Sequence, residues 1–265
     1  MTIDGTEASR SGALPSLPDG RLDGREALVT GAGAGIGAAC AWALASAGAR
    51  VTLVARRAGP LRELAAAIED GAGRARVAPC DVLDRAAFDA LVAGLPAVDI
   101  FVNNAGSNRP ASFLEVAVED FDAVMAINLR AAFFCAQSVA RCMVRAGKGG
   151  SIVNMSSQMG RVGGRGRTVY CASKHAIEGL TKAMALDLAE HRIRVNSVCP
   201  TFIETPMTRP FLADDDFRRD TLGRIPLGRL GRVGEVAAAV AFLAGDGAGL
   251  MTGSSLVVDG GWTAQ

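Results

Sequence analysis

Tyr170 and Lys174 are the residues whose types and spacing most directly suggest chemistry. They lie four positions apart in an Ala-rich stretch whose apolar residues recur every three or four positions, so the sequence predicts a helix with both side chains on one face. A free tyrosine has a pKa of about 10, but a fixed cation nearby favours the phenolate and lowers that pKa. The pair could therefore move a proton to or from a substrate oxygen. Taken alone, the pattern also fits a core-facing tyrosine beside a solvated lysine.

Composition limits the classes of protein to which the chain can belong. Its 265 residues are 49% hydrophobic and 5% aromatic, with 32 glycines, enough for one large α/β domain or two small ones. With 28 basic and 27 acidic residues, we expect neither a nucleic-acid binder nor a membrane-surface binder. We also expect no signal peptide, and no stretch that approaches the length of a membrane span.

The six cysteines form no C-x-x-C pair and no cluster with histidine. We therefore expect no disulfide framework, no metal site, and reduced thiols in a cytoplasmic protein. His175 and His191 are interpreted as ordinary helix residues.

The elements that must position Tyr170 alternate regularly. Residues 1–24, rich in Gly, Ser, Pro and Asp, are expected to form a flexible tail. Over residues 25–265 strands and helices alternate, which indicates one α/β domain of the Rossmann type: a doubly wound parallel sheet in three layers. Strands are expected at residues 26–30, 50–55, 75–80, 98–102, 151–156, 193–199 and 255–259. Helices are expected at about residues 36–47, 60–70, 84–95, 119–145, 168–190 and 234–244.

Ligands of such sheets bind beyond the carboxyl ends of the strands. That edge should carry the turn at Gly31 and the residues Arg56, Asp81, Asn104, Ser157 and Pro200. Residues 200–233, with proline, arginine and the acidic run 214–216, are interpreted as one long excursion beside this edge, and such loops are often lids.

A glycine-rich turn follows the first predicted strand. Residues 31–37 read Gly-Ala-Gly-Ala-Gly-Ile-Gly between a strand and a helix. Glycine lets the backbone approach a pyrophosphate, and the helix N-terminus supplies unpaired N–H groups and a positive dipole end. Turns need glycine in any case, but between a strand and a helix the pattern indicates dinucleotide binding.

The end of the second predicted strand bears on the choice of cofactor. An acid at this place hydrogen-bonds the 2′-hydroxyl of NAD, whereas an arginine accommodates the 2′-phosphate of NADP. Here the residues are Ala55, Arg56 and Arg57, with no acid. We therefore expect Arg56 to favour NADP(H), with NAD(H) as the alternative. The plainer explanation is a pair of solvated arginines.

These features resemble the short-chain dehydrogenase/reductase family over about residues 22–262. The motifs appear in the family's order: Thr30-Gly-Ala-Gly-Ala-Gly-Ile-Gly37, Asn103-Asn-Ala-Gly106, Asn128 in Ile-Asn-Leu-Arg, Ser157 thirteen positions before Tyr170, and Tyr170 with Lys174. One departure is Thr201 after Pro200, where the family usually has glycine. The added methyl and hydroxyl could alter the loop beside the nicotinamide.

The resemblance implies catalytic roles for Asn128, Ser157, Tyr170 and Lys174. Tyr170 would exchange the proton on the substrate oxygen, and Lys174 would lower its pKa and hold the nicotinamide ribose. Ser157 would polarise the substrate oxygen, and Asn128 would hold a water that links Lys174 to solvent. The residues that it implies for cofactor binding are Gly31, Gly33, Gly35, Ile36, Gly37, Arg56, Asp81, Val82, Asn104, Ala105, Gly106, Tyr170, Lys174 and Ile203.

The small-molecule substrate is less well defined. Residues on segments that should border the site are Asn108, Arg109, Arg161, Arg165 and Arg167. From these we take Asn108, Arg109 and Arg161, with Ser157, as substrate-binding candidates. They favour a polar or anionic substrate such as a sugar, polyol or sugar acid, unless they form only a solvated rim.

Two alternatives remain open. Residues 202–208 and 229–231 also resemble 3-oxoacyl-thioester reductases of the acyl-carrier-protein type. A non-catalytic dinucleotide-binding regulator is a more distant alternative, and the intact catalytic residues argue against it.

The predicted surface bears on assembly. The helices at residues 119–145 and 168–190 are apolar on more than one face, and the last strand is apolar and lies at a sheet edge. The resemblance implies a homotetramer with D2 symmetry, built on these helices and strands. The alternative is that these faces pack only within one subunit.

Overall fold

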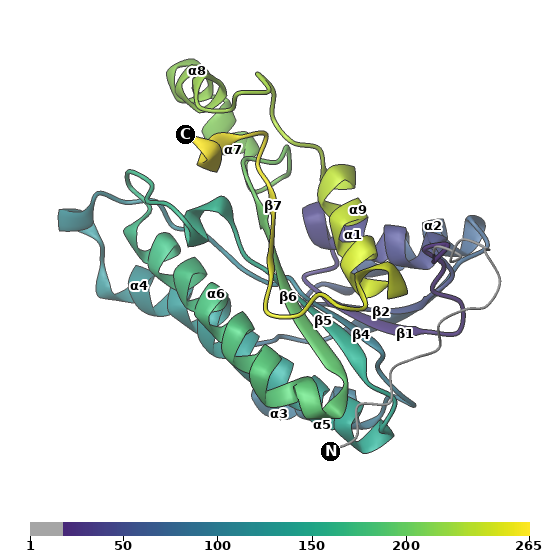
Figure 1. The fold of residues 1–265 in the computed structure, drawn as a ribbon. Coiled ribbons are helices and arrows are strands. Elements are labelled where there is room, and N and C mark those ends of the chain that lie inside the picture. The colour runs from purple at the N-terminus through teal and green to yellow at the C-terminus, as the bar shows by residue number, and fades with distance from the viewer. Residues whose placement is uncertain (1–17) are drawn as a thin grey trace, which may run out of the picture.

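The predicted strands form one sheet in a computed structural model, in which residues 18–265 are described. The strands are β1 (Glu26–Thr30), β2 (Arg50–Ala55), β3 (Arg74–Pro79), β4 (Ile100–Asn103), β5 (Gly150–Met155), β6 (Ile193–Pro200) and β7 (Ser255–Val258). They lie in the order β3-β2-β1-β4-β5-β6-β7 (Figure 1), and every neighbouring pair is parallel. The strand order reverses between β1 and β4, which confirms the predicted doubly wound α/β fold.

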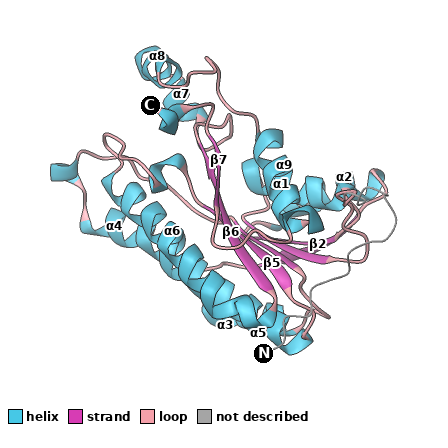
Figure 2. Cartoon of the chain, in the orientation of Figure 1, coloured by secondary structure: helices cyan, strands magenta, loops and turns pink. Residues whose placement is uncertain are grey.

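Helices cover both faces of the sheet (Figure 2). One face carries α1 (Gly35–Ser46), α2 (Ala58–Asp70) and α9 (Val233–Ala244), and the other carries α3 (Arg85–Ala93), α5 (Ala132–Ala146) and α6 (Thr168–Leu188). Successive strand residues point to opposite faces, so Leu28 is buried in one apolar cluster and Val29 in the other. The sheet is thus the middle layer of three.

The long helix predicted at residues 119–145 runs from Val118 to Ala146. It consists of α4 (Val118–Met125), a π-helical turn (Ala126–Ala131) and α5. The expectation that no stretch approaches the length of a membrane span is wrong, because these 29 residues are long and apolar enough to cross one. The stretch packs against β4, α3 and α6, and a single such helix is weak evidence for a membrane protein.

The predicted tail lies mostly outside the described residues. Within the described part, Leu22 is only 2% exposed, and its amide donates to the Ala47 carbonyl at 2.7 Å. Packing of the domain therefore begins three residues before the predicted boundary at residue 25.

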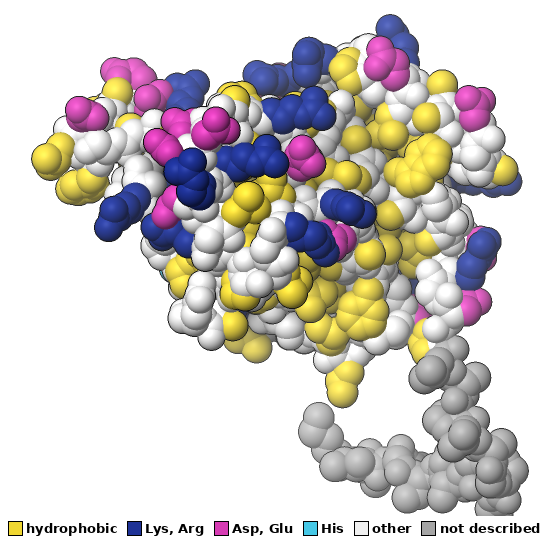
Figure 3. Space-filling model, turned by 90° about the horizontal axis from the view of Figure 1, so that it is seen from above, with side chains coloured by type: hydrophobic (Ala, Val, Ile, Leu, Met, Phe, Trp, Pro, Cys, Tyr) yellow, Lys and Arg dark blue, Asp and Glu magenta, His cyan; other side chains and the backbone are white. Residues whose placement is uncertain are grey.

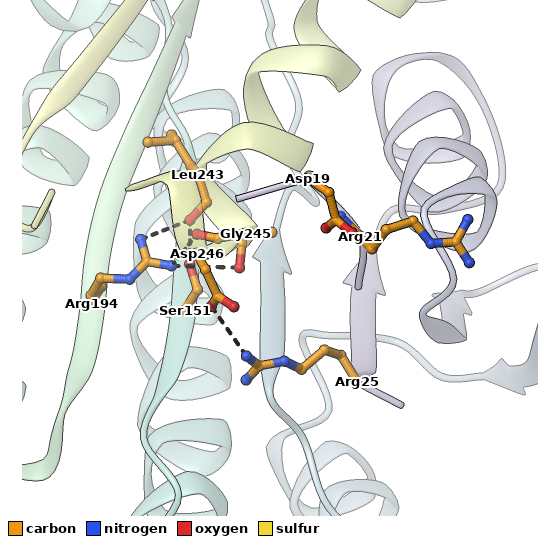
Figure 4. Close-up of polar contacts among 9 residues, drawn as sticks. Asp19, Arg21, Arg25, Ser151, Arg194, Leu243, Gly245 and Asp246 are labelled. Atoms are coloured by element: carbon orange, nitrogen blue, oxygen red, sulfur yellow. Dashed lines mark hydrogen bonds and ion pairs between the residues drawn. The ribbon is translucent and has the colours of Figure 1, made fainter. Parts of the chain in front are cut away.

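Arg194 fixes the end of α9 against the sheet (Figure 4). Its guanidinium donates to the carbonyls of Leu243 at 2.8 Å and Gly245 at 3.1 Å, and the Ser151 hydroxyl donates to Leu243 at 2.9 Å. The last carbonyls of a helix lack partners within the helix, and a cation there also suits the helix dipole. Side chains of β5 and β6 thus hold the C-terminal turn of α9.

The excursion at residues 200–233 contains two helices that the sequence analysis did not predict, α7 (Arg209–Leu212) and α8 (Asp215–Gly223). The Asp214 carboxylate accepts hydrogen bonds from the amides of Asp216 at 3.0 Å and Phe217 at 2.9 Å. The acidic run is therefore the N-cap and first turn of α8, where carboxylates are favourable. Both helices lie beyond the end of β7 (Figure 1).

Candidate active site

A cleft of about 440 Å³ lies at the carboxyl edge of the sheet. Figure 3 views the molecule from the α8 side, where hydrophobic side chains lie among basic and acidic ones. The sequence-predicted residues that line the cleft are Gly31, Gly33, Gly35, Ile36, Gly37, Arg56, Asp81, Val82, Asn104, Ala105, Gly106, Ser157, Tyr170, Lys174 and Ile203. The structure thus gathers every predicted cofactor residue in one place, beside the point where the strand order reverses.

The glycines of the turn are needed for different structural reasons. Gly31 has a φ of +67°, which favours glycine. A Cβ at Gly37 would collide with the Gly31 carbonyl and the Asn104 amide, whereas the nearest atom to a Cβ at Gly33 would be the Ala55 Cβ, at 3.5 Å. Gly37 is therefore required by the packing of the turn. A Cβ at Gly33 would make only ordinary van der Waals contacts within the protein, and Gly33 lines the cleft.

Asn104 holds this turn from the neighbouring strand. Its side-chain amide donates to the Thr30 carbonyl at 2.9 Å, and its backbone amide donates to the Thr30 hydroxyl at 3.0 Å. Asn104, one of the predicted cofactor residues, thus also has a structural role in the turn that the sequence did not reveal.

The cleft fits a nicotinamide dinucleotide. No side chain caps α1, whose N-cap is Ala34, and its first turn contains no acid. Its N-terminal N–H groups and dipole are therefore available to a phosphate. Arg56 and Arg57 line the cleft at the end of β2, are exposed, and form no ion pair with any residue among 18–265. They could bind a further phosphate at that end.

Ser157, Tyr170 and Lys174 meet at the other end of the cleft. Lys174 Nζ lies 5.6 Å from the centroid of the Tyr170 ring and donates to the Met155 carbonyl at 2.7 Å. Ser157 lies just beyond β5 and is 8% exposed, and its hydroxyl accepts from the Met159 amide at 3.1 Å. The phenol, hydroxyl and ammonium thus surround one end of a cavity that a ligand can enter.

Burial sets the protonation of this cluster. Burial raises the pKa of the Tyr170 phenol, and a hydrogen bond with Ser157 opposes that rise. Burial also lowers the pKa of Lys174 to about 8. The expectation that Lys174 brings the pKa of Tyr170 below its usual value is wrong for this structure, because desolvation of the phenolate outweighs the favourable interactions.

Asn128 supports the wall of the cleft through hydrogen bonds to Ser107. It lies in the π-helical turn and is 2% exposed; its side-chain oxygen accepts from the Ser107 amide at 2.8 Å, and its NH₂ group donates to the Ser107 carbonyl at 2.9 Å. Asn128 does not line the cleft, whereas Ser107 does. Its side chain therefore positions the cleft wall, and π-helical turns often occur at functional sites.

A side pocket of about 70 Å³ opens beside Ser157 and Tyr170. Its other lining residues are Asn108, Gln158, Met159, Arg167, Thr201, Phe202, Met207, Thr208 and Phe211. It shares Ser157, Tyr170, Thr201, Met207 and Thr208 with the cleft, so the two cavities adjoin.

Two of the predicted substrate residues are not in these cavities. Arg109 is exposed and pairs with Asp120 at 2.6 Å, and Arg161 is exposed; neither lines the cleft or the side pocket. Arg167, which sequence reasoning placed near the site but did not select, is 8% exposed and lines the side pocket. Arg167 is the N-cap residue of α6 and precedes the helix, so no helical spacing in the sequence marked it as the buried arginine.

Metal and disulfide chemistry find no support in the part of the chain that the structure describes. Residues 18–265 contain no group of three or more His, Cys, Asp or Glu that could hold a metal ion. All six cysteines are free thiols, and burial raises the pKa of Cys40 to about 12, so that thiol is unreactive.

A glycine-rich turn and a Ser–Tyr–Lys cluster on one cleft of a doubly wound sheet define a dinucleotide-dependent oxidoreductase. A family model described as Enoyl-(Acyl carrier protein) reductase matches residues 31–263. The chain belongs to the short-chain dehydrogenase/reductase family.

Similar proteins include several that act on sugars or polyols. D-threitol dehydrogenase of Mycolicibacterium smegmatis is 43% identical over 252 residues, 93% of this chain and 96% of that protein. L-xylulose reductase of Bos taurus is 42% identical, with 93% and 99% covered. A 3-oxoacyl-[acyl-carrier-protein] reductase of Thermotoga maritima is 40% identical, with 91% and 98% covered.

A solved structure shows the same architecture. The crystal structure of a gluconate 5-dehydrogenase from Burkholderia cenocepacia, in complex with NADP and tartrate, has a TM-score of 0.88. The two chains are 38% identical, and the match covers 93% of this chain and 98% of that one.

Proposed function

We propose that this protein transfers a hydride between NADP(H) and a secondary alcohol or ketone of a sugar, polyol or sugar acid. The observation that carries the proposal is that Ser157, Tyr170 and Lys174 line the same cleft as the glycine-rich turn. The sugar and polyol activities of similar proteins support this substrate class.

The chain's own residues divide the acid–base work. The bound nicotinamide supplies the hydride acceptor or donor. Tyr170, whose phenol has its pKa raised by burial, holds the proton that the substrate oxygen gains on reduction. Ser157 donates a hydrogen bond to that oxygen and stabilises its developing charge.

Lys174 and Asn128 have supporting roles. The Lys174 ammonium, 5.6 Å from the phenol ring, favours the phenolate whenever the proton has left. Asn128 keeps the Ser107 segment in place through two hydrogen bonds. The predicted water between Lys174 and solvent remains part of this proposal.

For the cofactor we propose a preference for NADP(H), with NAD(H) as the alternative. Arg56 and Arg57 line the cleft at the end of β2, where no acid is present to bind a ribose hydroxyl. The NADP bound in the similar gluconate 5-dehydrogenase supports this choice.

Reduction of 3-oxoacyl thioesters is the second candidate function. The 40% identity to a 3-oxoacyl-[acyl-carrier-protein] reductase favours it. A non-catalytic regulator is disfavoured, because Ser157, Tyr170 and Lys174 are all intact on one cleft.

A substrate panel read by the absorbance of reduced cofactor tests these proposals. It contains sugars, polyols, sugar acids and acetoacetyl thioesters, each with NAD(H) and NADP(H). We expect turnover of a sugar-type substrate with NADP(H). Turnover of the thioester alone would replace the first candidate with the second, and no turnover of any member would leave neither standing.

We also propose a homotetramer with D2 symmetry. Leu186 on α6 is 80% exposed, Phe133 on α5 is 40% exposed, and every residue of the edge strand β7 is partly exposed. Such apolar surfaces are favourable to cover. Light scattering at micromolar concentration should give about four times the 27.2 kDa monomer mass; a monomer would contradict the proposal.

The cytoplasm is the proposed compartment. The six free thiols support it, because an oxidising compartment favours disulfides. Cell fractionation with a compartment marker would test this placement, and recovery outside the cytoplasm would contradict it.

A further inference from the structure

The side pocket contains buried polar atoms that have no hydrogen-bond partner. Four such side-chain atoms occur among residues 18–265, and three of them line this pocket: Asn108 Oδ1, Gln158 Oε1 and Thr201 Oγ1. Gln158 is only 1% exposed. Leaving a buried polar atom without a hydrogen-bond partner is unfavourable. Three such atoms around one cavity therefore indicate that a bound ligand supplies the missing partners.

Arg167 adds an uncompensated charge to the same pocket. It is 8% exposed, and the one hydrogen bond that its guanidinium makes within residues 18–265, to the Gly166 carbonyl, is 3.3 Å long. No carboxylate among residues 18–265 pairs with it, and the pocket lining contains no Asp or Glu. A buried cation without an anion is unfavourable, so the pocket is suited to a negatively charged group.

The orientation of Arg167 is held by aromatic rings. Its guanidinium carbon lies 5.0 Å from the centroid of Phe211 in α7 and 5.9 Å from that of Phe217 in α8. A guanidinium next to aromatic rings keeps N–H donors for hydrogen bonding, and its fork matches a carboxylate bidentately. The two helices of the excursion thus present the cation to the pocket.

The size of the pocket restricts what fits. About 70 Å³ holds several water-sized groups, since one needs about 10–15 Å³ on this measure. A carboxylate with its neighbouring carbinol fits, and the rest of a sugar chain can continue past Ser157 and Tyr170 into the cleft, which shares those residues. A hydroxyl both donates and accepts, and so can satisfy amide and hydroxyl partners.

We infer that the substrate is a polyhydroxy acid, whose carboxylate is bound by Arg167 and whose hydroxyls bond to Asn108, Gln158 and Thr201. This inference rests on the proposed function and narrows it from sugars and polyols to sugar acids. Thr201, which replaces the usual glycine, thereby becomes a substrate contact instead of a disturbance.

Matched substrates test the inference. Gluconate and sorbitol differ only in a carboxylate against a CH₂OH group, and threonate and threitol differ in the same way. With NADP⁺ and wild-type enzyme, we expect kcat/KM to be at least about tenfold higher for each acid, because charge-assisted hydrogen bonds exceed neutral ones. This comparison needs no variant and does not depend on a mutant's folding.

The variant Arg167→Met tests whether Arg167 causes the preference for the acid. We expect kcat/KM for the acid to fall about tenfold to hundredfold. The ratio of kcat/KM for the acid to kcat/KM for the matching alcohol should fall with it. Arg165→Met is the matched control: Arg165 is exposed and lines neither cavity, so its ratio should equal that of wild type. Retained NADPH binding, measured by fluorescence, shows that each variant is folded.

The outcomes distinguish a failure of this inference from a failure of the proposed function. If wild-type enzyme uses sorbitol as readily as gluconate, or if Arg167→Met lowers both alike, the inference is overturned while the proposed function stands. If neither sugar acids nor polyols react and an acetoacetyl thioester does, the proposed function and the inference fail together.

Discussion

The two ends of the cleft are built on different principles. At the cofactor end, glycines and backbone groups shape the turn, and Asn104 is bonded to Thr30 within the protein. At the substrate end, Asn108, Gln158 and Thr201 present buried atoms without partners. At the cofactor end the protein itself therefore supplies the hydrogen-bond partners of Asn104, whereas at the substrate end the ligand supplies the missing partners.

Tyr170 lies where the two ends meet, and its removal should give the largest effect. Tyr170→Phe keeps the ring and its packing but removes the proton carrier, so we expect kcat to fall about 100-fold or more. Steady-state kinetics on the substrate found in the panel gives the loss. Near-normal turnover would show that another group carries the proton, and retained NADPH binding would show that the cofactor end is intact.

Arg56 tests the cofactor end alone. Arg56→Asp should lower kcat/KM with NADPH about tenfold to hundredfold, because a charge-assisted contact to the 2′-phosphate is lost and a like charge replaces it. Preference should shift towards NADH. Arg62→Asp makes the same charge change at an exposed position of α2 that does not line the cleft. A wild type that already prefers NADH would contradict the role of Arg56.

Two glycines separate packing from ligand binding within the turn. Gly37→Ala forces a Cβ against the Gly31 carbonyl and Asn104, so we expect the free energy of unfolding to fall by about 1–3 kcal/mol. Gly33→Ala meets nothing closer than 3.5 Å and should keep its stability but bind NADPH more weakly. Urea denaturation and fluorescence titration measure the two effects. Equal destabilisation by both variants would remove the distinction.

Lys174 should give the smallest effect, on stability. Its folded pKa of about 8 lies below the usual lysine value of 10.5, so the unfolded state binds more protons between these values and wild-type stability rises with pH there. Lys174→Met should be more stable than wild type below pH 8 by about 1 kcal/mol, since losing the bond to Met155 offsets part of the gain.

The advantage of Lys174→Met should shrink as the pH rises from about 8 towards 10.5. Urea denaturation at pH 7 and pH 10 measures it, with Lys148→Met, at an exposed position, as the control. A difference that does not depend on pH would mean that Lys174 is not buried as a strained cation.

The contrast between the two ends also explains what the sequence could predict. The turn at residues 31–37 is local, since a strand, seven residues and a helix suffice to define it. All predicted cofactor residues therefore line the cleft. The alternation of strands and helices predicted the sheet for the same reason: each signal lies within a few residues.

The substrate end depends on contacts between distant segments. Asn108, Gln158, Arg167 and Thr201 come from four separate places in the chain, and no spacing rule relates them. Arg109 and Arg161 have the same chemistry as Arg167 but are exposed outside the cavities. Which arginine is buried was decided by Phe211 and Phe217, in two helices that were predicted as loop.

The fixed end of α9 has a consequence for how ligands enter. The excursion joins β6 at one end and α9 at the other, where Arg229 pairs with Glu235 at 2.6 Å. Arg194 holds the opposite end of α9 through the carbonyls of Leu243 and Gly245. The excursion also contacts the C-terminal residues, because the Leu227 amide donates to the Gly260 carbonyl at 3.1 Å. We therefore expect an opening of α7 and α8 to involve residues 201–232 and the C-terminal residues beyond β7, and to leave α9 in place.

Amide hydrogen exchange should record this division as two classes of opening. Amides of α7 and α8, whose residues are mostly exposed, should exchange through local fluctuations of low free energy. Amides in the last turn of α9 should exchange only when the whole domain unfolds. The free energy of the local opening that admits a ligand is then much smaller than the free energy of global unfolding. A substitution that stabilises the sheet therefore need not lower the turnover rate.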